Sequence, residues 1–589
     1  MEQSSLEQLP DEILIDICYY LSSYEMLYSF YHINSRLNRT LTHFKHGVHL
    51  SQIPSMQFET YCQQIFPSIG YDVHSLIIHN KELAKYQIKL FTSKIELDQI
   101  FPYLEHLTLL ECDCDTLILY LTKLTLLNDL IELNIEYNEI ISVDMQTYLL
   151  QNIFLTQNSL IEVSLTSFHG FSLSKLSDSS TKINNLTISL KNISDMFMLF
   201  DLIPNIQHLN IHIRYNGPFS KIRCSNLTIK VPYLVDFHLK TTFEDAIQFS
   251  ELQLLTDNLP TLHSLSIETY TRDLNYVKGN RWQSLLVNLT KLYKFHCSIR
   301  LRFVIDDKCI YADDVLTSFS SDFWLIEKQW YVNCYLLNDG KYGKFYLHTV
   351  PYVYETFDAS IFVNNCESTY FDVNLTYPKV RQLNFDGRDE DLFKSSFYLM
   401  LNKFYNIREL KLDRLYIVSN PDDQSVSLHL LPKLIKLSLY TTTRGYINID
   451  FLTELLLMAP NLSSLFISYT ELVQLTERLE QISHTFRRIY QLEVLACREV
   501  RLNDIKLLSK IIVNLRWIKF HVKNIERTFS DGLFVCDVLN CFKSLTTLEI
   551  ACHGSCTKMK ALERNINSLL KDSRFFAEYD GKSLVLCVQ

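Results

Sequence analysis

Three histidines near the N-terminus have a spacing that would bring imidazole side chains together around a metal ion. His43, His46 and His49 recur at intervals of three residues, which on a helix would place them toward one face. We expect Gly47 to end any helix there. No carboxylate or cysteine lies nearby to complete a ligand set, so we expect no metal site in this segment.

The cysteine pairs offer equally little for metal binding or catalysis. Cys112 and Cys114, and likewise Cys552 and Cys556, lack the second pair that a structural zinc site requires. Cys552 is followed by His553, but neighbouring side chains on a strand point to opposite faces. We therefore do not expect this pair to act as nucleophile and base.

Motifs for nucleotide binding, serine hydrolysis and zinc peptidases are also missing. The patterns G-x-x-x-x-G-K-S/T, G-x-G-x-x-G, G-x-S-x-G and H-E-x-x-H do not occur, and only 12 of 589 residues are glycine. The sequence therefore predicts no catalytic residue and no cofactor, and we expect that the protein is not an enzyme. An enzyme with a dispersed site is the alternative, because short motifs would not reveal it.

Composition indicates a folded protein of the cytoplasm or nucleus. Hydrophobic residues make up 47% and charged residues 21% of the chain, which is more apolar than disordered chains are. The net charge of -10, with no long Lys/Arg run, argues against nucleic acid as a partner. The start is acidic and polar, unlike a signal peptide, and no stretch of 18 apolar residues predicts a membrane span. The 15 scattered cysteines favour reduced thiols over a disulfide framework.

A short apolar pattern recurs along most of the chain and is the main clue to its fold. An apolar residue is followed by two variable positions, a second apolar residue, one variable position and a third apolar residue, as in LPTLHSLSI. Successive patterns start 23 to 31 residues apart on either side of one long gap, and seven of the 13 prolines stand two residues before a start. Such regularity indicates internal repeats. The first apolar positions, here called anchors, are Val73, Leu104, Leu130, Leu160, Ile183, Ile206, Leu234, Leu262, Leu292, Val380, Ile407, Leu434, Leu462, Leu492, Leu515 and Leu545.

Each repeat is expected to contain a strand followed by a helix. The last two apolar positions alternate with polar ones, as on a strand with one buried face, and several intervening segments have helical spacing. Two such helical stripes are Leu392, Phe393, Phe397, Met400, Leu401 and Phe404, and Leu472, Leu475, Leu479, Ile482 and Phe486. Stacked units would bury their apolar faces against one another. Over roughly residues 73 to 570 the pattern resembles the longer, cytoplasmic leucine-rich repeats, although no regular Asn or Cys follows the third apolar position.

The anchors are interrupted between Leu292 and Val380, a gap close to three repeat lengths. The gap holds degenerate repeats or an insertion. Its segments WYVNCYLL and YGKFYLHTV flank Asp339-Gly340 and predict a β-hairpin. On one interpretation its alternate apolar side chains pack against the solenoid, namely Trp330, Val332, Phe345 and Leu347. On the other its exposed tyrosines contact a ligand, as aromatic residues do at binding hot spots, namely Tyr331, Tyr335 and Tyr346.

Residues 6 to 45 contain no anchor and have helical patterns throughout. Pro10 stands at an expected first helical position, with Asp11 and Glu12 at the positive end of the helix dipole. Second and third helices are predicted over 24–31 and 33–44. With its Leu-Pro-x-Glu-Ile-Leu opening, a central Leu27 and an Ile-x-x-Arg-x-x-Arg stretch from Ile33, the segment resembles an F-box. Its third helix departs from the usual Val-Cys-x-x-Trp.

Together the two resemblances point to F-box proteins with leucine-rich repeats, the substrate-receiving subunits of Skp–cullin–F-box ubiquitin ligases. They imply that the F-box docks on a Skp-like adaptor, and through it a cullin, while the repeats hold an unknown substrate protein. The alternative is a leucine-rich-repeat protein-binding scaffold with a helical N-terminal cap and no ligase link. The resemblance places at the adaptor surface Leu9, Pro10, Ile13, Leu14, Leu21, Leu27 and Ile33. Substrate contacts are expected from variable strand positions, namely Glu105, His106, Gln207, His208, His263, Ser264, Arg408, Glu409, Ile435, Lys436, Ser463 and Ser464.

The sequence therefore predicts an α/β fold. A three-helix F-box precedes a leucine-rich-repeat solenoid with parallel strands on its concave side and helices on its convex side. The expected divisions are an F-box over 5–45, a connector over 46–72, repeats over 73–297, degenerate repeats or an insertion over 298–378, repeats over 379–570, and a C-terminal cap over 571–589.

Overall fold

The chain folds into two compact units of repeated strands and helices. Unit 1 comprises residues 1–330 and 340–349, and unit 2 comprises residues 331–339 and 350–589. The computed structural model describes residues 9–19, 21, 23–30, 33, 36, 46–50, 53, 55–79, 85–112, 114–137, 142–154, 159–173, 182–214, 231–304, 310–339, 342–359, 367–370, 376–386, 392–413, 417–418, 430–440, 448–496, 500–522, 532–552, 556–570, 575–579 and 583–588.

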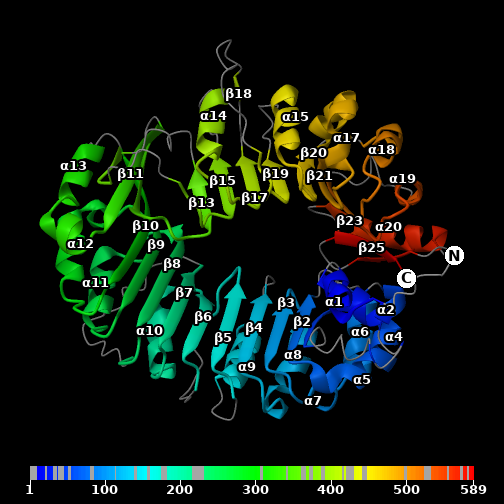
Figure 1. Ribbon diagram of the computed structural model, residues 1–589, viewed down its shortest axis with the longest axis horizontal. Coiled ribbons are helices and arrows are strands. Elements are labelled where there is room, and N and C mark those ends of the chain that lie inside the picture. The colour runs from blue at the N-terminus through cyan, green and yellow to red at the C-terminus, as the bar shows by residue number, and fades with distance from the viewer. Residues whose placement is uncertain are drawn as a thin grey trace. The chain divides into compact units, whose positions relative to one another are not determined.

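Unit 1 is built on strands that follow one another in chain order, each parallel to the last, with the strands inside an arc and helices outside (Figure 1). These strands are β1 (Gly47–His49), β2 (Ser75–His79), β3 (His106–Leu110), β4 (Glu132–Tyr137), β5 (Glu162–Ser167), β6 (Asn185–Leu190), β7 (His208–Ile213), β8 (Asp236–Glu244), β9 (Ser264–Thr271) and β10 (Lys294–Val304). Strand β12 (Tyr342–Val350) then pairs antiparallel with β10. The run of parallel strands therefore includes β1, which lies in the segment expected to be a connector.

The helices α1 and α2 precede the first strand of unit 1, and its other helices lie between successive strands, as the alternating periodicity predicts. Its α-helices are α1 (Asp11–Tyr19), α2 (Ser23–Phe30), α4 (Ser55–Thr60), α5 (Phe66–Ile69), α6 (Lys85–Lys94), α7 (Leu97–Ile100), α8 (Cys114–Leu121), α9 (Val143–Ile153), α10 (Ile193–Leu202), α11 (Phe249–Asp257), α12 (Gly279–Leu286) and α13 (Ala312–Ser318). Shorter 3-10 or π turns are η4 (Tyr61–Ile65), η5 (Gly70–Asp72), η6 (Leu124–Leu126), η8 (Leu274–Val277) and η9 (Phe323–Glu327).

Unit 2 repeats the same plan. Its parallel strands are β13 (Thr356–Ala359), β15 (Gln382–Asp386), β17 (Glu409–Asp413), β19 (Lys436–Tyr440), β20 (Ser464–Ser468), β21 (Gln491–Ala496), β22 (Trp517–Val522) and β23 (Thr547–Cys552). The antiparallel strands β25 (Ser583–Val588) and β24 (Phe575–Tyr579) follow β23. Its helical elements are α14 (Lys394–Leu401), α15 (Ile449–Met458), α16 (Tyr469–Leu475), η12 (Thr476–Arg478), α17 (Leu479–Phe486), α18 (Leu502–Ser509), α19 (Leu533–Cys541) and α20 (Cys556–Leu569).

The anchors form the core between strands and helices. All sixteen are no more than 2% exposed, and fifteen stand two residues before a strand. Leu492 is the exception, because the register pairs it with Leu465 and not with the anchor Leu462. The true anchor of this repeat is Ile489, which is also fully buried. Both Ile489-x-x-Leu492-x-Val494 and Leu492-x-x-Leu495-x-Cys497 fit the repeat pattern. The sequence therefore allows two phases, and the predicted phase is wrong.

The gap between the two runs of anchors contains a repeat that the sequence pattern missed. Tyr354 is buried and stands two residues before β13, which pairs parallel with β15, so Tyr354 takes the place of an apolar anchor. Strands β11 (Tyr331–Asp339) and β12 cover the two arms of the predicted hairpin. In unit 2, β11 pairs antiparallel with the short β14 (Glu367–Ser368).

The aromatic segment of the gap is mostly buried. The four side chains expected to pack inward are at most 9% exposed, namely Trp330, Val332, Phe345 and Leu347. Tyr335, expected to be exposed, is only 3% exposed, and its hydroxyl donates to the carbonyl of Asp358 at 3.3 Å. Tyr331 and Tyr346 are half-buried. Burial of Tyr335 removes it from the candidate ligand contacts.

Both predicted helical stripes divide into more than one element. Leu392 and Phe393 form the strand β16 (Leu392–Phe393), which pairs with β18 (Ile417–Val418), and the helix starts only at Lys394. The second stripe spans α16, η12 and α17. The positions Phe397, Met400, Leu401 and Phe404 of the first stripe and Leu472, Leu475, Ile482 and Phe486 of the second are buried. The buried face was therefore predicted correctly at these positions, although the continuity of the helix was not.

Asparagine side chains connect neighbouring repeats of unit 2. The side-chain amides of Asn406, Asn461 and Asn514 each donate to a main-chain carbonyl of the preceding repeat at 2.7–2.8 Å. Each asparagine directly precedes an anchor. A hydrogen bond to a main-chain carbonyl at a turn contributes about 1 kcal/mol, so these amides stabilise the stacking of the repeats. The sequence analysis did not predict a role for asparagine at this position.

The front helices α1 and α2 pack through a small apolar cluster. Cys18 and Met26 are buried, with Leu21 and Phe30 packed against them. Most of the predicted third helix lies outside the described residues. Of that helix, Ile33 and Arg36 are described. None of the described helices is long and apolar enough to cross a membrane.

Candidate functional site

The strands of both units present every second side chain on an open face of the sheet. In β7, Leu209, Ile211 and Ile213 are buried, whereas His208, Asn210 and His212 lie on the other face. This alternation is the usual consequence of the strand repeat of two residues. The open faces collect polar and aromatic side chains from repeats that are 23 to 31 residues apart in sequence, which makes them the candidate binding surfaces.

The predicted substrate-binding residues fall into two rows. Those that begin a strand lie on the open face or at its start, namely His106, His208, Ser264, Glu409, Lys436 and Ser464. Those one residue earlier lie at the edge where the chain enters the strands, namely Glu105, Gln207, His263, Arg408, Ile435 and Ser463. The main-chain carbonyls of this edge row connect the repeats, since Glu105 O accepts from the amides of Ile131 and Glu132 at 2.9 and 3.0 Å.

Histidines of unit 1 pair with carboxylates of the neighbouring repeat. His208 Nδ1 lies 2.6 Å from Asp236 Oδ2, and His106 Nδ1 lies 2.7 Å from Glu132 Oε2. His74 Nδ1 lies 3.1 Å from Glu105 Oε1. All six side chains are more than a third exposed, so each pair contributes little to stability and is available to a partner molecule.

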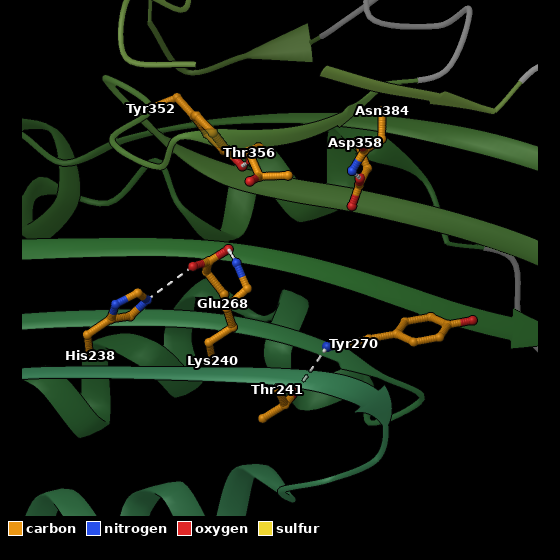
Figure 2. Close-up of polar contacts among 9 residues, drawn as sticks. All are labelled: His238, Lys240, Thr241, Glu268, Tyr270, Tyr352, Thr356, Asp358 and Asn384. Carbon is orange, nitrogen blue, oxygen red and sulfur yellow. Dashed lines mark hydrogen bonds and ion pairs between the residues drawn. The ribbon is translucent and has the colours of Figure 1, made fainter. Parts of the chain in front are cut away.

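Glu268 on β9 is the most buried charged group of this face. Its carboxylate accepts from His238 Nε2 at 3.1 Å and from Lys240 Nζ at 3.0 Å, both on β8 (Figure 2). Burial opposes ionisation of Glu268, but the bonds from His238 and Lys240 prevail and lower its pKa to about 2. Glu268 is therefore a fixed negative charge, held by two neighbours and not free for proton transfer.

His212 lies beside this cluster on β7. Burial, and then the charges of Arg214 and Lys240, lower the pKa of His212 to about 3. Its Nδ1 is buried with no hydrogen-bond partner among the described residues. The imidazole is therefore neutral at physiological pH and serves as part of the polar surface, not as an acid.

A shallow hollow of about 140 Å³ opens next to these side chains on β6 to β9. Its polar lining comes from Asn185, His208, Asn210, Asp236, His238, Ser264 and Ser266. The volume suits a single protruding side chain of a partner, whereas pockets for small-molecule ligands are usually above about 300 Å³.

The open face of unit 2 is more aromatic. The rings of Tyr440 on β19 and Phe466 on β20 lie 4.7 Å apart, and His521 on β22 lies 5.9 Å from Phe466. His521 Nε2 also lies 3.1 Å from Glu493 Oε2. Aromatic side chains of this kind supply much of the energy at protein interfaces.

At the beginning of the same face Asn384 donates to Asp358 at 2.7 Å, and Tyr352 donates to the carbonyl of Thr356 at 2.8 Å (Figure 2). These bonds join β15 to β13 and hold the tyrosine of the preceding loop. They are structural contacts, since each polar group already has its partner.

The described part of the chain contains few groups suited to catalysis or metal binding. No cluster of three or more His, Cys, Asp or Glu side chains there has metal-binding geometry. Burial raises the pKa of Cys62 to about 12 and raises that of Cys297 as well, so neither thiol is a nucleophile at neutral pH. His46 and His49 lie in or beside strand β1 and not on a helix, and His43 lies outside the described residues.

The front helices divide the predicted adaptor-binding residues into two groups. Pro10, Ile13 and Ile33 are exposed, the isoleucines at 44% and 51%, whereas Leu14 and Leu27 are buried at 3% and 1%. Leu9 and Leu21 are half-buried. The buried leucines belong to the interior of the protein, whereas the three exposed residues are accessible to a partner.

Several site residues escaped the sequence analysis. His212 and Glu268 stand four positions after the predicted contacts His208 and Ser264, and His238 and Lys240 lie on β8, from which no contact was predicted. The signal was present, because polar residues continue to alternate with apolar ones along HLNIHI and DFHLK. Only the stacking of strands shows which of these polar residues meet.

These features define the class of the protein: an α/β solenoid of leucine-rich-repeat type, with parallel strands on one face and helices on the other. No protein-family model and no curated protein matches the chain.

The solved structures that are similar to the chain include two of low sequence identity. A crystal structure of a Rad7 and Elc1 complex in yeast matches with 13% identity over 89% of this chain and 90% of that chain, at a TM-score of 0.25. The leucine-rich repeat-containing protein LegL7 from Legionella pneumophila matches with 11% identity over 76% of this chain and 94% of that chain, at a TM-score of 0.20. At such TM-scores neither likeness carries an argument about function.

Proposed function

We propose that the protein is the substrate-receiving subunit of a cullin-based ubiquitin ligase and is not itself an enzyme. The F-box-like front helices would bind a Skp-like adaptor, and the open sheet faces would hold the substrate protein. Tethering in this way raises the effective concentration of substrate near the ubiquitin-charged enzyme without new chemistry.

The observation that carries the proposal is the exposure of Ile13 and Ile33. Two large aliphatic side chains on a module of this size gain about 1.5–3 kcal/mol each when a partner buries them. Arg36 is oriented by Asp11, 2.8 Å from its Nε, and by the carbonyl of Leu9. The LPDEIL opening thus contributes the exposed Ile13 and the two contacts that orient Arg36.

A separate observation favours a second candidate function, that of a scaffold with a helical cap. Tyr28 of α2 stacks on Tyr61 of η4 with ring centroids 6.3 Å apart, and α2 also contacts β1. Such packing is what a helical cap on the first repeat requires. The second candidate is therefore a protein-binding scaffold whose front helices only cover the end of the array.

Replacing Ile13 by aspartate tests the two candidates. We expect Ile13→Asp to abolish retention of a Skp-like adaptor by the full chain while the far-ultraviolet circular dichroism and thermal midpoint stay unchanged, because Ile13 is exposed. Affinity capture of the purified adaptor is the measurement. Ile161→Asp is the matched control, since Ile161 is equally exposed at 43% in a distant repeat.

Two results would overturn the ligase proposal. One is that the unaltered chain fails to retain the adaptor. The other is that Ile13→Asp lowers the thermal midpoint by several degrees, which would mean that Ile13 packs within the fold and would favour the cap.

A further inference from the structure

Basic side chains gather where the chain enters the strands of unit 2. In the five-residue segments that lead into its parallel strands, eight residues are basic and Glu355 is the single acid. The basic residues are Lys379, Arg381, Arg408, Lys433, Arg487, Arg488, Arg516 and Lys543. The corresponding segments that lead into β2 to β10 of unit 1 contain two lysines and three acids, namely Lys182, Lys291, Asp72, Glu105 and Asp129. The basic edge thus belongs to unit 2 alone, in a chain whose net charge is -10.

Four of these cations surround a hollow of about 480 Å³. Lys379, Arg381, Arg408 and Lys433 line it, together with Asn406 and Glu355. Their formal charges sum to +3. The volume is within the range of ligand sites, and more than three times that of the hollow on the open face of unit 1.

Most of these four cations have no acidic partner among the described residues. Arg381 Nε lies 3.4 Å from Glu355 Oε1, but both side chains are more than half exposed, so water weakens the pair. Lys433 donates to Asn406 Oδ1 at 2.6 Å, a neutral acceptor. The side chains of Lys379 and Arg408 have no hydrogen-bond or ion-pair partner among the described residues.

The two arginines directly precede neighbouring strands. Gln382 and Glu409 are register partners in β15 and β17, so Arg381 and Arg408, one residue earlier, stand about 5 Å apart, the spacing of adjacent strands. The amide of Arg408 donates to the carbonyl of Arg381 at 2.6 Å. Two guanidinium groups so placed can each bind two oxygens of one tetrahedral anion.

We propose that this hollow binds a phosphorylated serine or threonine side chain of a partner protein. A phosphomonoester carries a charge of about -1.5 to -2 and three acceptor oxygens, which match the charge of +3 and the paired guanidinium groups. The remaining volume admits the flanking peptide. Single-stranded nucleic acid fits less well, since none of the lining residues is an aromatic that would stack on a base. The inference rests on the proposed role of the repeats in holding substrate, and names a class of substrate.

Peptide pools test the proposal with the full chain. The probes are two fluorescein-labelled pools with randomised flanks, one with a central phosphoserine and the other with serine, and fluorescence anisotropy measures their binding. We expect the phosphorylated pool to bind at least about tenfold more tightly, in line with charge-assisted bonds, and inorganic phosphate to compete. Arg408→Gln and Arg381→Gln should each remove most of this preference, whereas Arg516→Gln, on the same edge but outside the hollow, should keep it.

Three results would overturn it. One is equal binding of the two pools, and another is an intact preference in Arg408→Gln. The third is tighter binding of an oligothymidylate of equal charge that loses affinity equally in Arg408→Gln and Arg516→Gln. The last would indicate a general polyanion edge. Adaptor retention is measured in the same samples and should be unchanged in Arg408→Gln, so loss of phosphopeptide binding is distinguished from failure of the ligase proposal.

Discussion

Single residues of the open face in unit 1 show how burial sets charge. Glu268 is kept ionised by His238 and Lys240, and His212, one strand further away from Glu268, is kept neutral by burial and by nearby positive charge. Both conditions depend on side chains from neighbouring repeats. Glu268 and His212 therefore keep the same charge states between pH 5 and 8.

His212 should make the protein sensitive to acid. Its pKa is about 3 in the folded state against about 6.5 in the unfolded chain, so from about pH 6.5 downward only the unfolded chain takes up the proton. Stability is therefore lost as the pH falls. We expect His212→Gln to reduce the loss in unfolding free energy between pH 7 and pH 5 by about 2 kcal/mol, measured by urea unfolding.

His348 contributes a similar dependence, since burial lowers its pKa to about 4, so some acid sensitivity should persist in His212→Gln. An unchanged loss between pH 7 and pH 5 in the variant would show that His212 is not the cause.

At the scale of elements, the repeats are joined by close main-chain approaches as well as by side chains. Gly279 begins α12, and its amide donates to Ser318 Oγ at 2.8 Å, which connects α12 to the end of α13. A Cβ atom at this position would lie 2.1 Å from the carbonyl oxygen of Ser318. Only glycine permits the two helices to approach so closely.

Gly279→Ala should therefore destabilise unit 1. Because the clash involves main-chain atoms, the helices must separate, at a cost of about 1–3 kcal/mol. A lower midpoint in thermal or urea unfolding is the expected result. Gly47→Ala is the matched control, since a Cβ there meets nothing within 4 Å. Equal midpoints for the two variants would contradict the predicted clash.

At the scale of the whole molecule, each unit must close the ends of a sheet whose strands would otherwise offer unpaired main-chain groups. In unit 2 the last parallel strand, β23, pairs antiparallel with β25, and Leu584 and Leu586 of β25 are fully buried. Helix α20 holds this closing pair, since Asn567 exchanges two hydrogen bonds with the main chain of Ala577 at 2.8 and 2.9 Å.

Removal of residues 571–589 should expose the edge of β23 and cause self-association. We expect the shortened chain to sediment as larger species than the full chain at equal concentration, because an unpaired edge strand pairs with other chains. Analytical ultracentrifugation is the measurement. Identical sedimentation of the two chains would mean that the closing pair is dispensable.

The class of fold was readable from the sequence because its signal is local. Alternation around each anchor requires only neighbouring residues, and fifteen of sixteen anchors were placed in phase. The exception, Leu492, shows the limit: two apolar triplets overlap there, and only pairing with β20 selects Ile489. The repeat that begins at Tyr354 was not predicted, because a tyrosine occupies the anchor position that is aliphatic in the predicted repeats.

The candidate sites depended instead on tertiary structure. The sequence pointed to Ile13, Leu14 and Arg408 as binding residues but did not distinguish buried from exposed members of that set. Contacts between residues 26 to 30 apart, such as Glu268 with His238, arise only when repeats stack. Strand register brings together charges that the chain keeps a full repeat apart, and this is why the basic hollow around Arg408 has no linear motif.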